Sequence, residues 1–151
     1  MSPETTTTDK LAALITAKQQ VLEILVQLSR RQLDLIGAGD MTTLMKLLAG
    51  KHTVMTHLQL IERELAPFRD QDPDQRVWNS IGERVACQTR ARHCNALLSD
   101  AMEMEKKAEA AMLERRQTSA AALSAIQAGV NAKAAYDSFP PTALASLHVE
   151  G

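Results

Sequence analysis

Aromatic residues are scarce in this sequence of 151 residues, which holds one Trp, one Tyr and two Phe, only 3% of the chain. Compact globular folds usually rely on large aromatic side chains for much of their buried area. Hydrophobic residues still make up 45% of the chain, and seven of them are Met, so a core can form. This composition favours slender helices packed side by side. We expect a single domain, because domains commonly span about 100–200 residues.

An excess of charge of either sign is also absent. Lys and Arg number 17 against 18 Asp and Glu, which gives a formal net charge of -1. Proteins that bind nucleic acid present an excess of positive charge to the phosphate backbone. The basic cluster between Arg84 and His93 is soon followed by acidic residues between Asp100 and Glu105, as on a solvated helix face. No nucleic-acid partner is therefore predicted.

Long apolar runs are missing as well. The segment from Met1 to Asp9 is polar and rich in Thr, and it lacks the basic start and apolar run that mark a signal peptide. No stretch approaches the roughly 18–20 continuous apolar residues that span a bilayer. We therefore expect a cytoplasmic protein without membrane insertion.

Cysteine is rare, and the two residues, Cys87 and Cys94, are seven positions apart. On a helix this separation is roughly 10 Å along the axis. A disulfide requires α-carbons within about 7 Å, so an internal bridge is excluded if the segment is helical. Both thiols are expected to be reduced, as is usual in the cytosol.

Apolar residues spaced by three and four positions predict two helices, over about 10–36 and 41–66. Gly37 and Gly39 are expected to end the first helix, since glycine accepts the left-handed conformation common at helix ends. Asp40 is the predicted N-cap of the second helix, and Pro67 is predicted to close it. The main apolar row of the second helix includes Met41, Leu44, Leu48, Lys51, Met55 and Leu58, and a flanking row holds Leu47, Val54 and Ile61. Two helices joined by so short a turn form an antiparallel hairpin.

The third helix is predicted over about 73–135, with Asp72 as N-cap and Pro73 at its first position. From Pro73 to Ala128 alone it would be roughly 80 Å long, whereas each hairpin helix is roughly 40 Å long. The predicted fold is therefore all-α: an elongated antiparallel hairpin packed on a long third helix, as a three-helix bundle or coiled coil. Residues 1–9 are expected to be a flexible tail, 10–136 the helical domain and 137–151 a mobile tail.

Because the hairpin covers only about half of the third helix, residues 110–135 must pack on something else, fold back or fray. An isolated helix of this kind is marginal in water. Ser119, Leu123, Ile126 and Val130 fall on one face of it. Met112 precedes them, and methionine adapts readily to apolar partners, although most methionines simply fill a core. We therefore predict a partner-binding surface along this face, for helix-in-groove or coiled-coil packing.

The residues that could support catalysis or bind metal do not converge. His52 and His57 are five apart, so they miss the i, i+4 face of a helical zinc site. Acidic pairs such as Glu103 and Glu105 are two apart and diverge on a helix, and no Glu-x-x-His pattern occurs. The cysteines fall on the apolar stripe, where thiols are usually inert. No enzyme activity, metal or cofactor is predicted.

The run Leu35-Ile36-Gly37-Ala38-Gly39-Asp40-Met41, followed by Leu44, Leu47, Leu48 and Lys51, resembles the turn between the first two helices of the FlgN family of flagellar export chaperones. Asn95, before Leu97-Leu98, is similar to one of a pair of Asn in that family, with Arg92 at the other position. Tyr136 resembles the aromatic residue that often follows the family's third helix. The resemblance covers about residues 10–136.

This resemblance implies a cytoplasmic chaperone that holds hook–filament junction subunits unassembled before secretion through the flagellar type III apparatus. It also implies that the end of the third helix and the tail bind the client, and that the export apparatus is a second partner. The alternative is a structural coiled-coil protein that self-associates through its third helix. A weak homo-oligomer is compatible with both interpretations, and the sequence leaves both open.

Overall fold

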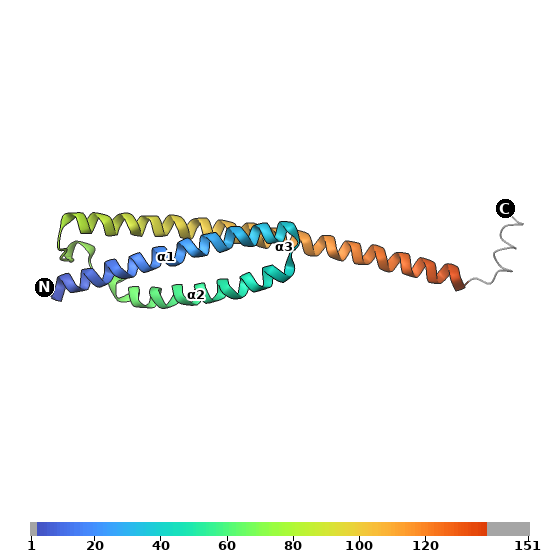
Figure 1. Cartoon of the computed structure of the whole chain (residues 1–151), viewed down its shortest axis with the longest axis horizontal. Helices are drawn as coiled ribbons and strands as arrows, with labels where there is room; N and C mark the ends of the chain where they lie inside the picture. Colours follow the sequence, from blue (N-terminus) through green and yellow to red (C-terminus); the bar gives the residue numbers. More distant parts are fainter. Residues whose placement is uncertain (1–2, 139–151) are drawn as a thin grey trace, which may run out of the picture. The chain divides into compact units, whose positions relative to one another are not determined.

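The computed structural model describes residues 3–138, which form helices α1 (Pro3–Ala38), α2 (Met41–Arg69) and α3 (Ile81–Ser138) and a short 3-10 helix, η1 (Pro73–Gln75) (Figure 1). No strand occurs among these residues, so the predicted all-α class is confirmed. The chain divides into two units, Met1–Ala111 and Met112–Gly151. The described part of the second unit is the continuation of α3 from residue 112 to 138.

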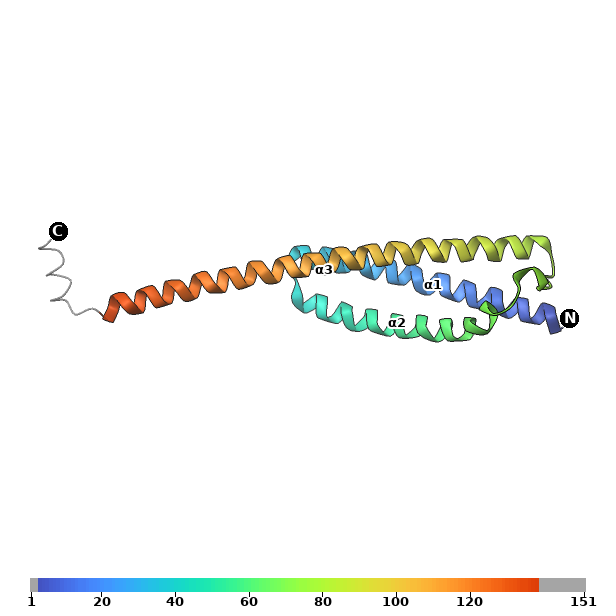
Figure 2. The same cartoon turned by 180° about the vertical axis from the view of Figure 1, so that it is seen from behind.

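In the first unit α1 and α2 form the predicted antiparallel hairpin, and the beginning of α3 runs alongside α1 (Figures 1 and 2). Gly39 has a positive φ of 74°. Its N–H donates to the Ile36 carbonyl at 3.1 Å, and the N–H of Asp40 donates to the Leu35 carbonyl at 3.1 Å. This pair of bonds is a Schellman motif, which satisfies carbonyls at the end of α1. Gly37 lies inside α1, so Gly39 alone makes the turn.

Asp40 caps α2 as predicted. Its Oδ1 accepts a hydrogen bond from the Thr43 N–H at 3.1 Å, and its Oδ2 accepts one from the Thr43 hydroxyl at 2.7 Å. These hydrogen bonds stabilise the carboxylate and lower the pKa of Asp40. The cap satisfies a donor that the first turn of α2 would otherwise leave unpaired.

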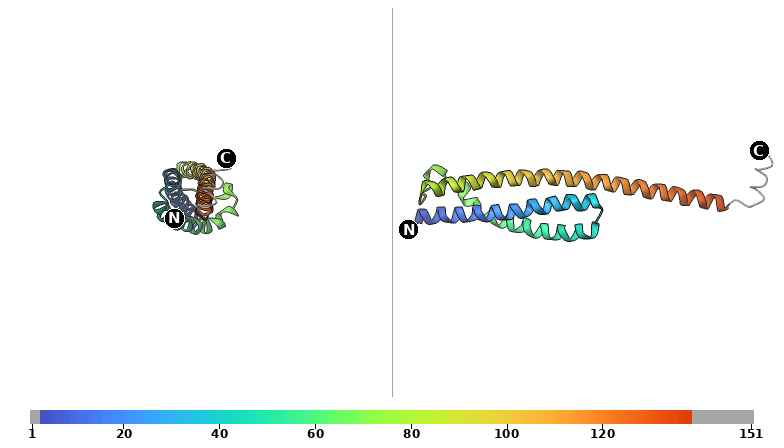
Figure 3. Two further views of the ribbon diagram at one scale, coloured as in Figure 1. Left: turned by 90° about the vertical axis from the view of Figure 1, so that its right-hand side faces the viewer. Right: turned by 45° about the horizontal axis from the view of Figure 1, so that its top comes forward.

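Two apolar clusters form the core of the first unit. The Cys94 Sγ lies 3.8 Å from the Ile15 carbonyl oxygen, which brings α3 against α1. Figure 3 shows the same three helices from two further directions. One cluster contains Leu11, Leu14, Val21, Ile61, Leu65, Phe68 and Cys87, and the other contains Leu22, Leu25, Val26, Cys94 and Ala101.

Residues Thr5–Ala38 are long and apolar enough to cross a membrane, judged by length and composition alone. The core helix of a soluble protein and a signal sequence both meet the same criteria, so this finding is weak evidence of a membrane-spanning helix. In the first unit, Leu22, Leu25 and Val26 of this helix are buried against Cys94 and Ala101 of α3.

The predicted flexible tail over residues 1–9 is wrong for residues 3–9, which are helical. Pro3 begins α1, and proline suits the first helical position because its missing N–H has no intrahelical acceptor there. The Thr8 hydroxyl donates to the Val77 carbonyl at 2.8 Å, and the Asn79 side-chain amide donates to Asp9 at 3.0 Å. These contacts with a distant segment hold the first turns in place. Residues 1–2 lie outside the described chain.

Pro67 does not close the second helix, since α2 continues to Arg69. Proline in a helix loses one hydrogen bond and crowds the preceding turn. Phe68, directly after Pro67, is buried in the core, and burial of such a side chain contributes about 1.5–3 kcal/mol. Arg69 also forms an ion pair with Glu62, about two turns earlier. Both interactions require the helix to extend past the proline.

The third helix begins at Ile81 rather than at Pro73. The Asp72 side chain does cap a helix, accepting from the Asp74 N–H at 3.0 Å, but that helix is the three-residue η1. The true cap is Ser80, whose Oγ accepts from the Glu83 N–H at 3.1 Å. Residues 80–83 match the Ser-x-x-Glu capping pattern, so the sequence did contain this signal.

Candidate partner-binding surface

Along α3, burial stops partway. Cys87, Cys94, Ala101 and Ala108, at intervals of seven, are the buried residues of this helix. Met112 and Arg115 are half-buried, and every described residue from 116 to 138 is exposed. The apolar stripe of α3 thus includes a covered part, which ends near Ala108, and an uncovered part beyond it.

The uncovered part continues the same spacing. Ser119, Leu123, Ile126 and Val130 alternate in steps of four and three, the 3.5-residue repeat that keeps side chains along one helix face. We call these four residues, with Met112, the α3 stripe. The exposed fractions are 66% for Leu123, 63% for Ile126 and 55% for Val130. Single exposed apolar residues are common on protein surfaces, but three in register on one face indicate a binding surface.

The surface around the α3 stripe is uncharged and shallow. Between Gln117 and Ala132 there is no Lys, Arg, Asp or Glu, and six of these residues are Ala. A Cβ added at Gly129 would meet nothing within 4 Å. Such small side chains let the backbone of a second helix approach closely. The stripe is therefore suited to a partner that supplies the large apolar side chains.

Two of the predicted functional residues lie away from the stripe. Tyr136 is exposed, but six helical steps of 100° place it about 120° around the helix from Val130. Asn95 is also exposed and lines a shallow hollow with Leu98 and Met102. The structure therefore brings together Met112, Ser119, Leu123, Ile126 and Val130 along one helix face, without Tyr136 or Asn95.

The two apolar rows of α2 are both partly buried. Leu44, Lys51, Ile61 and Leu65 are buried, and Val54 and Leu58 pack against the core. Met45 and Met55 are exposed, while Met41 and Leu48 are only half-buried. The buried residues thus come from both rows, since Leu44 and Lys51 belong to the predicted main row and Ile61 to the flanking row. The spacing finds both rows, but only packing decides which positions of each row are covered.

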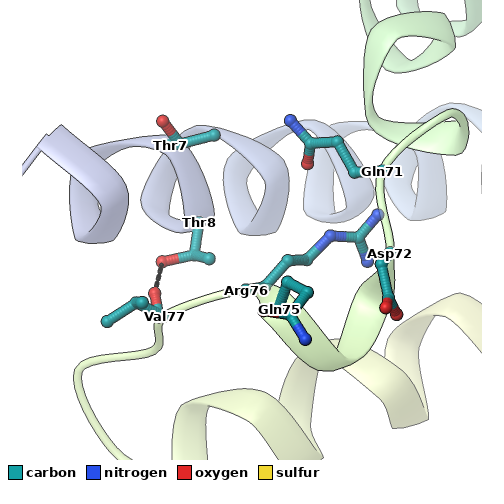
Figure 4. A pocket seen from close by; sticks show the side chains of 7 residues that line it. All are labelled: Thr7, Thr8, Gln71, Asp72, Gln75, Arg76 and Val77. Atoms are coloured by element: carbon teal, nitrogen blue, oxygen red, sulfur yellow. Dashed lines mark hydrogen bonds between the residues drawn. The ribbon is translucent and has the colours of Figure 1, made fainter.

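A hollow of about 380 Å³ lies between the start of α1 and the loop around η1 (Figure 4). Its lining includes Thr8, Asp72 and Arg76. The Thr8 hydroxyl is engaged with the Val77 carbonyl, and an Arg76 guanidinium nitrogen donates to the Phe68 carbonyl at 2.6 Å. Both polar groups donate hydrogen bonds to backbone carbonyls. We therefore interpret the hollow as part of the packing between α1 and the η1 loop.

Metal-binding and thiol chemistry find no support in the part of the chain that the structure describes. Residues 3–138 contain no group of three or more His, Cys, Asp or Glu side chains that could hold a metal ion. Cys87 and Cys94 are free and buried in the core. Burial raises the pKa of both thiols, although Arg76 near Cys87 and Lys18 near Cys94 act in the opposite direction. The reactive thiolate is thus disfavoured at both positions.

We therefore expect Cys87 and Cys94 to react slowly with 5,5′-dithiobis(2-nitrobenzoic acid) in the native protein. Access requires the bundle to open, so the rate should be lower by about 100-fold or more than in urea. Absorbance at 412 nm, followed with and without urea, measures this difference. Fast reaction of either thiol in buffer alone would contradict the core packing of α1 against α3.

Comparison with known proteins adds nothing to this surface: the chain matches no protein-family model, no curated protein and no solved structure. Its function is therefore argued from the exposed stripe and from the residues of the hairpin turn. The stripe pairs no nucleophile with a base, and its one polar member, Ser119, is neutral. What such a surface can do is bind another apolar helix.

Proposed function

We propose that this protein is a cytoplasmic chaperone that binds an amphipathic helical segment of its client along the α3 stripe. The clients are hook–filament junction subunits, which it keeps unassembled before secretion through the flagellar type III apparatus. The observation that carries the proposal is the uncovered, uncharged apolar face at Leu123, Ile126 and Val130.

The energetics of the exposed helix support a binding role. A solvated helix without packing is only marginally stable. Burying an apolar side chain of the size of Leu123, Ile126 or Val130 contributes about 1.5–3 kcal/mol each. A client helix laid on this face would therefore stabilise α3 while covering its own apolar residues. That mutual covering is the physical basis of a chaperone that prevents premature assembly.

The client class is supported by the resemblance of the hairpin turn to the FlgN family. The residues that carry the resemblance have definite physical roles, since Gly39 provides the left-handed turn and Asp40 caps α2. Lys51, at the end of the same run, donates to Gln32 on α1 at 2.8 Å and pairs with Glu105 on α3. The matching segment thus joins all three helices of the first unit.

The proposal is tested by replacing Leu123 and Ile126 together with Asp. Two carboxylates on the apolar face should weaken binding of purified hook–filament junction subunits by about 100-fold or more, because burying an unpaired charge is strongly unfavourable. Isothermal titration calorimetry measures the affinity, and circular dichroism should show unchanged helical content because both positions are exposed.

A matched control uses Leu113, which is on the same helix and 52% exposed but lies about 110° from the centre of the stripe. The Leu113→Asp change should leave binding within about twofold of the unaltered protein, since it lies off the binding face. If the double Asp variant binds the subunits as tightly as the unaltered chain, the client does not use the stripe and the proposal is wrong.

A further inference from the structure

The part of the α3 stripe from Ser119 to Val130 has a cation on each side of it. Arg116 and Lys133 occupy positions of the same 3.5-residue repeat that contains Ser119, Leu123, Ile126 and Val130, so they lie on the binding face. Both are exposed. Within residues 3–138 neither of them forms an ion pair. They are 17 residues apart, or roughly 25 Å along the helix.

This charge pattern opposes pairing of the stripe with a second copy of itself. In a parallel, in-register pair, Arg116 would face Arg116 and Lys133 would face Lys133. Residues that face each other in an antiparallel pair have residue numbers with a constant sum. In the register that sets Leu123 against Ile126, each Arg116 would therefore face a Lys133. Like charges placed opposite each other at an interface are unfavourable and select against that partner. Both registers that match the apolar residues therefore bring two cations together at each end.

The same pattern favours a partner of opposite charge at its ends. A helix with an acidic residue near each end of an apolar segment would pair one carboxylate with Arg116 and the other with Lys133. Asp137, one turn beyond Lys133 on the same face, would repel a carboxylate placed further along. Since the surface around the α3 stripe is rich in Ala, a partner with large apolar side chains fits it best. The spacing of the two cations thus defines the length of the segment that fits.

We propose that the segment bound by the α3 stripe is a helix with large apolar residues between two acidic positions about 16–18 residues apart. This inference rests on the proposed function and specifies the chemistry of its client. Apolar burial supplies the affinity, while the two charge pairs set the register and exclude a second copy.

Two fluorescent 23-residue peptides test the proposal on the full chain. Both carry the same Leu and Ile stripe; one has Glu at the two end positions and the other has Lys. Fluorescence anisotropy should show that the Glu-ended peptide binds about tenfold more tightly at low salt, as expected for two exposed charge pairs. The preference should shrink at 0.5 M salt because exposed charges are screened.

Charge reversal of the chain provides the matched comparison. The double variant Arg116→Glu with Lys133→Glu should prefer the Lys-ended peptide. Arg92→Glu with Lys106→Glu makes the same change in net charge at exposed positions outside the stripe, so it should keep the preference for Glu. A reversal in both double variants would show that only the overall charge matters, and would overturn the inference.

The other outcomes separate this inference from the proposed function. The two peptides could bind equally well to the unaltered chain and fail to bind the double variant Leu123→Asp with Ile126→Asp. That result would overturn the charge pairing and leave the stripe as the client site. Failure of both peptides to bind would overturn both ideas. In that case the mass of the protein is measured by light scattering across a dilution series. A stable oligomer that Leu123→Asp dissociates would identify a second copy of the chain as the occupant of the stripe.

Discussion

Replacing Leu22 with Ala is expected to lower the free energy of unfolding by about 2–5 kcal/mol. The Leu22 side chain is 0% exposed and packs in the cluster that contains Leu25, Val26 and Cys94. Truncation removes its apolar contacts and leaves a cavity that three packed helices cannot easily close. Because single domains usually have only about 5–15 kcal/mol of net stability, the effect is a large fraction of the total.

The matched comparison is Leu123→Ala, the same chemical change on an exposed part of α3. It should alter the free energy of unfolding by less than about 0.5 kcal/mol, as is usual for surface substitutions. Urea denaturation followed by circular dichroism, at one low protein concentration, measures both variants. A loss at Leu123 as large as that at Leu22 would mean that the stripe is already buried, and that the isolated chain covers it by self-association.

The second large effect is expected at the polar contact inside the bundle. The Lys51 ammonium donates to the Gln32 side-chain oxygen at 2.8 Å and forms an ion pair with Glu105. The Lys51 side chain is 9% exposed and that of Glu105 is 46% exposed, so the cation depends on its partners while the carboxylate is partly solvated. Breaking a fully buried pair by removing one partner costs about 3–5 kcal/mol. With the solvation of Glu105 considered, Glu105→Gln should cost about 1–2 kcal/mol.

Lys51→Met removes the buried charge but leaves the buried Gln32 side-chain oxygen without its donor, so it should lower the free energy of unfolding by about 1–3 kcal/mol. The double variant Lys51→Met with Glu105→Gln should then be about as stable as Lys51→Met alone, because Glu105 no longer has a cation to pair with. Urea denaturation of the four proteins completes the cycle. Strictly additive effects would show that the ion pair contributes nothing to stability.

Several elements followed from short stretches of sequence. The turn between α1 and α2 was predicted from Gly39 and Asp40, because a left-handed glycine and a capping carboxylate act on their own neighbours. The helical spacing of the apolar residues likewise predicted α1, α2 and α3 in order. Hydrogen bonds between residues a few positions apart produce these features, so a local pattern is sufficient to find them.

Two of the errors occurred where a tertiary contact competed with a local signal, and a third where one local capping signal was preferred to another. Residues 3–9 look like a polar tail, yet Thr8 is held by Val77. Proline at position 67 is a strong helix terminator, yet burial of Phe68 carries α2 past it. Asp72 and Pro73 form a good helix start, yet only a 3-10 turn follows and Ser80 caps the longer helix.

The sequence by itself determined the helical class, the hairpin turn and the apolar repeat of α3 from Cys87 to Val130, because each depends on residue type and spacing along one helix. It could not determine which positions of the two α2 rows are covered or where burial on α3 ends, since the apolar spacing continues past Ala108. The tertiary structure decided both points. Three helices can exclude water only where all three are present, so burial on α3 ends near Ala108 and the described residues from 116 onward are exposed.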